Sequence, residues 1–189
     1  TVKEEKLLLM AAESKEPNDI INAVKQVISN CIISGEFDVD KVPFFDVDFL
    51  FIFLRAKSIG ESVDVKMTCH AVNDKGDKCG HTFPTSMDIS KCEIVRVEGL
   101  SNKIALDADK GVKMKYPTYS TMKRIENGDP IDQKTNVIVN SIDYIYDEKG
   151  MYSWKDYSKE ELKEFVEGLT EENFNKLQDF VDNFPTIVV

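Results

Sequence analysis

Residues 45–69 read FDVDFLFIFLRAKSIGESVDVKMTC, and the hydrophobic period of the chain changes within them at Gly60. Before the glycine the stretch is apolar on almost every side, which is typical of a central helix enclosed by other helices. After the glycine, Val63, Val65 and Met67 alternate with polar residues, as in a half-buried strand. Because a helical pattern leads directly into a strand pattern, the sequence predicts a mixed architecture.

Helical periodicity dominates the two ends of the chain. Residues 17–32 place apolar side chains at steps of three and four, which puts one face of a helix on a core. Residues 132–147 also repeat isoleucines at helical steps and predict another helix. Near the C-terminus, Ser158 and Glu161 have the spacing of a capping box, and Thr170 is placed to cap a final helix.

Short extended runs follow residue 61 and are separated by Gly, Asn and Asp, which predicts a small antiparallel sheet. We therefore expect an α+β fold, in which two halves of a helical bundle flank a small antiparallel β-sheet or hairpin insertion. The expected ranges are 1–60 for the N-terminal helices, 61–117 for the β region with its Cys/His hairpin, and 118–189 for the C-terminal helices. These ranges would form one or two packed domains.

Composition limits the classes of partner. The 189 residues carry a net charge of −10, and affinity for phosphate backbones comes from cationic groups, so we expect no nucleic-acid partner. No apolar run approaches the ~20 residues that span a bilayer, so we expect no membrane span. Four cysteines without a regular framework indicate reduced thiols in a cytoplasm.

Two cysteines and both histidines of the chain fall within residues 67–83, MTCHAVNDKGDKCGHTF. Cys69, Cys79 and His81 are the candidate metal ligands, because thiolates and imidazoles are the groups that zinc prefers. However, nine residues separate the cysteines, whereas a zinc knuckle uses two. An ordinary β-hairpin with a long polar loop is the other interpretation. We expect no cofactor, with a structural zinc ion as the alternative, since no Glu follows a His in a hydrolytic arrangement.

The sequence contains no recognisable catalytic motif. Its nine glycines form neither a GxxxxGK nor a GxGxxG loop, and no serine lies in a GxSxG turn. With both histidines in one loop, a nucleophile–histidine relay has almost no candidates. We therefore expect that the protein is not an enzyme. The alternatives are a metal-dependent enzyme or a zinc-ribbon adaptor centred on Cys69, Cys79 and His81.

Residues 151–157, MYSWKDY, form the best candidate for a protein-binding segment. Met151, Tyr152, Trp154 and Tyr157 are of types that are enriched at binding hot spots. The alternative is that the aromatic rings simply pack onto the helical bundle. From residue 151 onward the chain has four Lys and nine Asp or Glu, an acidic balance that would steer a basic partner.

Several stretches of the chain are together similar to one known family. They are residues 2–14, VKEEKLLLMAAES; residues 45–69, quoted above; residues 101–118, SNKIALDADKGVKMKYPT; and residues 142–185, IDYIYDEKGMYSWKDYSKEELKEFVEGLTEENFNKLQDFVDNFP. In these stretches the chain resembles the baseplate hub assembly proteins of T4-like, contractile-tailed bacteriophages. RAKSIGE at residues 55–61 and the pair YSKEEL and LTEENF are the most specific pieces.

The resemblance implies a non-enzymatic role in assembling the viral tail baseplate hub, by contact with other phage baseplate hub proteins. It implies the cytoplasm of the infected bacterial host as the location, with the virion tail baseplate as the alternative. It also implies that the Cys69–Cys79 hairpin corresponds to half of a zinc ribbon. Members of the family carry further segments at both ends. The capping pattern of Thr1 with Glu4 and the abrupt TIVV ending likewise lead us to expect residues beyond both termini.

Overall fold

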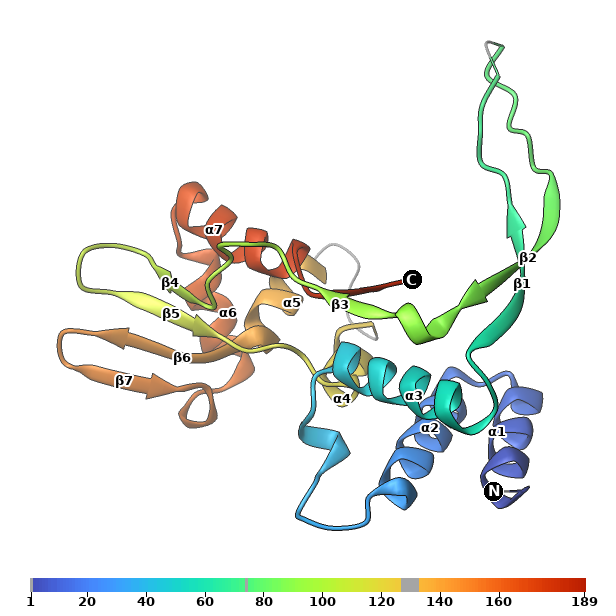
Figure 1. Cartoon of the computed structure of the whole chain (residues 1–189). Coiled ribbons are helices and arrows are strands. Elements are labelled where there is room, and N and C mark those ends of the chain that lie inside the picture. The colour runs from blue at the N-terminus through green and yellow to red at the C-terminus, as the bar shows by residue number, and fades with distance from the viewer. Residues whose placement is uncertain (1, 74, 127–132) are drawn as a thin grey trace.

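The computed structural model describes residues 2–73, 75–126 and 133–189 of the chain. Figure 1 shows a helical N-terminal lobe, a C-terminal lobe of sheet and helices, and a β-hairpin that projects from the body. Helices occur together with small antiparallel sheets, so the predicted α+β class is confirmed. Within these described ranges, no helix has the length and apolarity to cross a bilayer.

The N-terminal lobe consists of helices that pack around a small core. Its elements are α1 (Val2–Ser14), α2 (Pro17–Cys31), the 3-10 turn η1 (Val39–Lys41) and α3 (Phe44–Ser58). Ile28 of α2, Val39 of η1 and Val47 of α3 meet in that core, and Tyr119 packs against it. Tyr119 begins helix α4 (Tyr119–Glu126), so α4 also belongs to this lobe.

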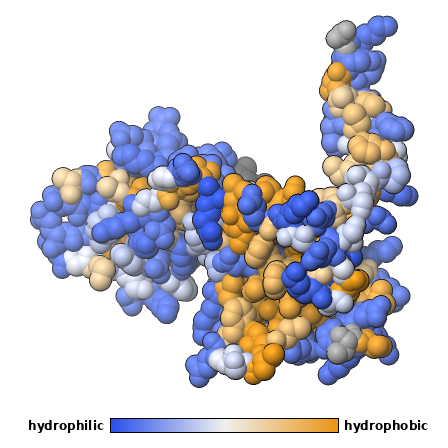
Figure 2. All heavy atoms as spheres, in the orientation of Figure 1, coloured by the Kyte–Doolittle hydropathy of each residue, from blue (hydrophilic) through white to orange (hydrophobic). Residues whose placement is uncertain are grey.

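The sequence predicts that α3 is enclosed on all sides, and this prediction is wrong. Phe45, Val47 and Ala56 are buried, but the side chain of Phe53 is 51% exposed and the rest of residues 49–54 are only half-buried. Figure 2 shows apolar side chains gathered on the surface where α3 lies. Within the described residues, the outer face of α3 is therefore partly open to solvent, and the helix covers the core with its other face.

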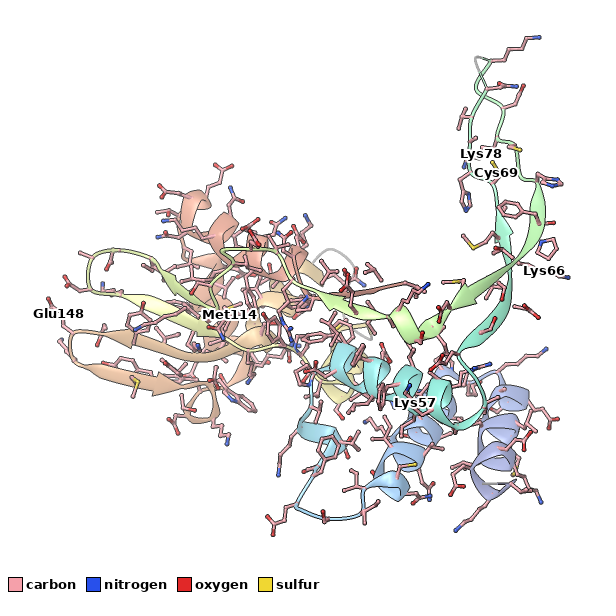
Figure 3. The ribbon with its side chains drawn as sticks, in the orientation of Figure 1. Lys57, Lys66, Cys69, Lys78, Met114 and Glu148 are labelled. Carbon is pink, nitrogen blue, oxygen red and sulfur yellow. The ribbon has the colours of Figure 1, made fainter. Side chains whose placement is uncertain are left out.

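The C-terminal lobe packs helices against an antiparallel sheet. In the part of the chain that the structure describes, its strands lie in the order β4 (Lys103–Ala105), β5 (Gly111–Met114), β6 (Ile142–Asp147) and β7 (Gly150–Ser153). The helices are α5 (Gln133–Ser141), α6 (Lys159–Glu167) and α7 (Glu171–Asp182). Met114, labelled in Figure 3, lies in one core with Val112, Ile138, Val139, Ile142, Leu162, Val166, Leu177 and Phe180.

The predicted helix over residues 132–147 is only partly correct. Residue 132 lies outside the described residues, α5 ends at Ser141, and the stretch IDYIYD that follows forms β6. This stretch is rich in β-branched and aromatic residues, which fit a pleated surface better than a helix. Ile145 pairs with Val112 of β5, so the same isoleucines that suggested a helical stripe fill the sheet side of the core. The predicted capping box of Ser158 with Glu161 is confirmed.

The strands expected within residues 61–117 belong to three separate sheets. β1 (Ser62–Thr68) pairs with β2 (Thr82–Asp88) in the projecting hairpin. β3 (Glu93–Val95) pairs with β8 (Thr186–Val188), near the end of the chain. β4 and β5 join β6 and β7 in the C-terminal lobe. The region 118–189 therefore contributes strands as well as helices.

An aromatic seam joins the two lobes. The ring of Tyr116 stacks on Phe180 of α7, with centroids 5.3 Å apart, and meets the edge of Phe45 of α3 at 5.1 Å. Phe184 packs against both Tyr116 and Phe180, at 6.0 and 5.6 Å, and Phe44 contacts Phe184 at 6.4 Å. Each such pair contributes about 0.5–1.5 kcal/mol beyond its buried area. Phe45 and Phe180 are fully buried, so the lobes share one apolar contact.

A hydrogen bond beside this seam connects α3 with α4. The Tyr119 hydroxyl donates to the carboxylate of Asp48, 71 residues away in the sequence. Burial raises the pKa of Asp48, and the hydrogen bond from Tyr119 offsets part of that rise. Burial and the neighbouring carboxylate also raise the pKa of Tyr119 well above its ordinary value. The hydroxyl therefore remains a donor across the physiological pH range.

We expect Tyr119→Phe to lower the free energy of unfolding by about 1–2 kcal/mol at pH 7, because the half-buried carboxylate of Asp48 loses its donor. The raised pKa of Asp48 means that stability falls as this carboxyl ionises with rising pH, and the hydroxyl limits that fall. The cost of the substitution should therefore shrink as the pH is lowered through the pKa of Asp48. Urea unfolding at neutral and acid pH measures both effects.

The matched control for this prediction is the same substitution in an Asp48→Asn background. There the amide oxygen accepts only a neutral hydrogen bond from the hydroxyl, so Tyr119→Phe should cost less than it does in the wild type. An equal cost in both backgrounds would show that the hydroxyl stabilises the fold by some route other than Asp48.

Candidate functional site

The aromatic connector, residues 151–157, runs from β7 into the 3-10 turn η4 (Trp154–Asp156) at the surface of the C-terminal lobe. The side chain of Met151 is 73% exposed, Trp154 is 37% exposed, and Tyr157 is similarly exposed. Tyr152 is half-buried. Three of the four side chains are thus at least about a third exposed, and their role in partner binding stays a prediction.

The connector residues divide into two groups by their contacts. Tyr152 donates its hydroxyl to Asp147, 3.2 Å away, at the turn between β6 and β7. The backbone amide of Lys149 also donates to Asp147, and together with further donors it lowers the pKa of that carboxyl. Tyr152 therefore supports the turn. Trp154 instead faces Lys115, whose ammonium lies 3.7 Å from the centroid of the indole ring, in a cation–π contact.

Trp154 and Tyr157 line a cleft of about 710 Å³ between the two lobes. The N-terminal lobe supplies one wall from η1 and the chain after it, including Pro43. The other wall comes from β5, the residues that follow it, α5, η4 and the start of α6. The charged lining residues are mostly lysines, namely Lys41, Lys113, Lys115, Lys155 and Lys159, with Asp40 and Asp143. A chain with net charge −10 thus concentrates cations around one cleft.

The net charge of the cleft lining remains positive when the ion pairs of its charged side chains are taken into account. Two of the lining charges are neutralised by residues outside the lining, since Asp40 pairs with Lys25 at 2.6 Å and Lys41 pairs with Asp38 at 3.0 Å. Lys113 donates to the amide oxygen of Asn102, a neutral partner, at 2.5 Å. Within the described residues, neither Lys155 nor Lys159 has a carboxylate close enough for an ion pair, and both are exposed. Close cations in a partly enclosed cleft raise the local potential and attract anions.

The lining determines what this cleft can bind. Lysine ammonium groups are donors for carboxylates, while Trp154, Tyr157 and Tyr116 offer flat apolar surface. The lining of the cleft includes neither histidine nor cysteine. This combination favours an anionic ligand that also carries apolar groups.

The lysines of the cleft are not among the binding residues predicted from the sequence. Lys113 and Lys115 are two residues apart on an extended segment, which places both side chains on one face. Lys155 and Lys159 are four residues apart near the start of α6. Each pair is visible in the sequence, but only the packing of η4 against the sheet, with Trp154 under Lys115, brings the pairs together.

The backbone of the Cys/His hairpin contains a β-bulge next to Cys69. The Cys69 amide donates to the His81 carbonyl at 2.8 Å, and the Gly80 amide donates to the Cys69 carbonyl at 3.1 Å. Gly80 has φ +63°, the left-handed conformation that glycine adopts without strain. Two residues on one strand thus oppose one on the other, which is a bulge of the glycine-containing type.

The three predicted metal ligands do not converge in this hairpin. Cys69 is half-buried, Cys79 is exposed, and the exposed ring of His81 stacks on Phe83 with centroids 6.3 Å apart. Across the described ranges, no three His, Cys, Asp or Glu side chains are grouped so that they could hold a metal ion. The arrangement does not fit a zinc site of these three ligands, and the expectation of no cofactor, with structural zinc as its alternative, stays a prediction.

We expect protein purified without chelator to contain less than about a tenth of a zinc ion per chain, because a structural site needs four converging ligands. Elemental analysis measures this directly. Cys79→Ser should change the free energy of unfolding by no more than about 0.5 kcal/mol, as at other exposed positions. Stoichiometric zinc that is lost in the serine variant would contradict the prediction.

Comparison with protein families gives a match over the chain. The model of the family described as T4 bacteriophage base plate protein matches residues 1–189, the whole sequence given. No curated protein and no solved structure matches the chain significantly. The family match agrees with the resemblance seen in the sequence and confirms its phage baseplate assignment. The chain belongs to the T4 bacteriophage base plate protein family.

Proposed function

We propose that this protein is a non-enzymatic assembly component of the phage tail baseplate hub and acts by contact with other hub proteins in the host cytoplasm. Membership of the baseplate family supports a structural role. The main structural support is that Trp154 and Tyr157 line a lysine-rich cleft between the lobes. Aromatic side chains in a concave site are typical anchors for a partner protein.

The chemistry of the cleft indicates the kind of segment that docks there. An extended acidic segment would pair with Lys155 and Lys159 at the rim, and an apolar side chain of that segment would pack on Trp154. The sequence predicts a basic partner from the acidic C-terminal third. For the cleft we instead propose a negatively charged partner segment. The acidic outer faces of α6 and α7 remain the surface where a basic partner would bind.

An alternative of a different class is a metal-dependent enzyme or a zinc-ribbon adaptor centred on Cys69, Cys79 and His81. That reading requires a metal ion at the hairpin, whereas the proposed contact uses the cleft in the body of the protein. Full zinc occupancy together with substrate turnover would favour the enzyme.

The proposed contact is tested by mixing the chain with individual baseplate hub proteins and measuring binding by calorimetry. We expect Trp154→Ala to weaken the complex about 30-fold, as truncation of a hot-spot residue costs about 2 kcal/mol. Reversing both rim charges, Lys155→Glu with Lys159→Glu, should weaken it further and reduce its salt dependence.

Two matched variants control for general effects of aromatic truncation and charge reversal. Phe53→Ala removes an exposed aromatic ring on α3, and Lys110→Glu reverses an exposed charge in the turn before β5, both outside the cleft. Both should leave the affinity within about twofold. A complex that forms equally well with the cleft variants would show that the interface lies elsewhere.

A further inference from the structure

The β1–β2 hairpin is an amphipathic ribbon. Its register pairs Ser62 with Asp88 at the base and Thr68 with Thr82 farther out. Directly opposite residues share a face, so Val63, Val65 and Met67 lie on the same face as Met87, Thr85 and Phe83. The other face carries polar residues, among them Asp64 and Lys66.

The outer part of the apolar face is uncovered. Met67 is 47% exposed and Phe83 is 43% exposed, while the valines nearer the body are half-buried. Figures 1 and 3 show why, since the hairpin extends away from both lobes, with Lys66 labelled on it. A two-stranded ribbon is marginally stable alone in water, and a further strand beside it would extend its apolar face.

Backbone hydrogen bonds at both ends of the ribbon show which groups face outward. The Cys69 amide donates to the His81 carbonyl, and the Ile89 amide donates to the Glu61 carbonyl. Odd-numbered residues of β1 therefore direct their backbone groups toward β2. Ser62, Asp64, Lys66 and Thr68 direct theirs to the free edge of β1, where no strand pairs in the described part of the chain.

The free edge of β2 differs from that of β1. By the same alternation Pro84, which lies opposite Lys66, has its backbone nitrogen on the free edge of β2. Proline has no amide hydrogen, so it removes a donor from that edge and opposes the addition of another strand. The edge of β1 has no proline and stays competent for pairing.

We propose that two copies of this chain associate by pairing the free edges of their β1 strands, antiparallel, about a two-fold axis at Val65. This register places Asp64 of each copy opposite Lys66 of the second copy, which forms two pairs of opposite charge. Ser62 then lies opposite Thr68, and all outward-facing backbone groups of the strand oppose one another. The product is a four-stranded sheet in which the two apolar faces are continuous.

Charge selects this register among those that the backbone allows. A slip by one residue would place outward-facing backbone groups of one copy opposite inward-facing groups of the other. It would also continue the apolar face of one copy into the polar face of the other. Moving the axis by one residue, to Asp64 or to Lys66, would place that residue opposite its own copy, and like charges directly opposite destabilise a sheet. Only the axis at Val65 pairs the whole strand with complementary charge. This surface is separate from the cleft, so the inference does not depend on the proposed function.

Sedimentation of the full chain over a concentration series tests the proposal, and charge exchange between copies makes the test specific. We expect the wild type to form dimers, and Asp64→Lys or Lys66→Asp alone to weaken dimerisation about tenfold, because each creates two like-charge pairs. Mixing the two single variants should restore association, since every cross-copy pair is then opposite in charge. The double exchange in one chain should also dimerise.

Further variants separate edge pairing from loss of the hairpin. Asp64→Pro removes an outward-facing amide and should abolish the dimer, while circular dichroism and the melting temperature stay close to the wild type. Lys110→Glu, in the turn before β5, reverses an exposed charge outside the hairpin and should not affect association. A wild type that is monomeric at about 1 mM overturns the proposal. So does a dimer that is indifferent to the charge exchange, or an edge occupied instead by another baseplate protein or by a segment of this chain outside residues 1–189.

Discussion

The ring of Tyr116 packs between Phe45 and Phe180 and holds the two lobes of the molecule together. Phe45 comes from the N-terminal lobe and Phe180 from the last helix, so these rings join parts of the chain that are 135 positions apart. The backbone reinforces the contact, because the Phe44 amide donates to the carbonyl of Pro117 at 3.1 Å. Stacked and edge-on rings fix a crossing geometry as well as burying area, so the seam sets how the lobes face each other.

That geometry creates the proposed binding site. Pro43, on the N-terminal side of the cleft, directly precedes the phenylalanines of the seam, and Lys115, on the other side, directly precedes Tyr116. The cleft is therefore a consequence of joining the lobes at the seam. The projecting hairpin lies outside this arrangement and provides an independent surface. The cleft and the open strand edge are the two surfaces for which we propose contacts, and the chain belongs to a phage baseplate family.

Local signals in the sequence predict much of this fold, and long-range pairing explains the rest. The capping box at Ser158 depends on four neighbouring residues, and the alternation in β1 on seven, so both are visible without a structure. Residues 142–147 satisfy a helical stripe and a strand face equally well, and only pairing with β5 decides between them. The sequence does not show that Trp154 is exposed, because its exposure depends on which elements pack around it. The lysines near Trp154 also come together only when separate elements pack against one another.

The aromatic seam should make the two lobes one cooperative body. Differential scanning calorimetry of the wild-type chain and of Tyr116→Ala measures this coupling. We expect a single wild-type transition whose calorimetric and van't Hoff enthalpies agree, and separate transitions for the two lobes once the central ring is removed. Two resolved transitions in the wild type would mean that the lobes unfold independently despite the seam, and that the seam does not couple them.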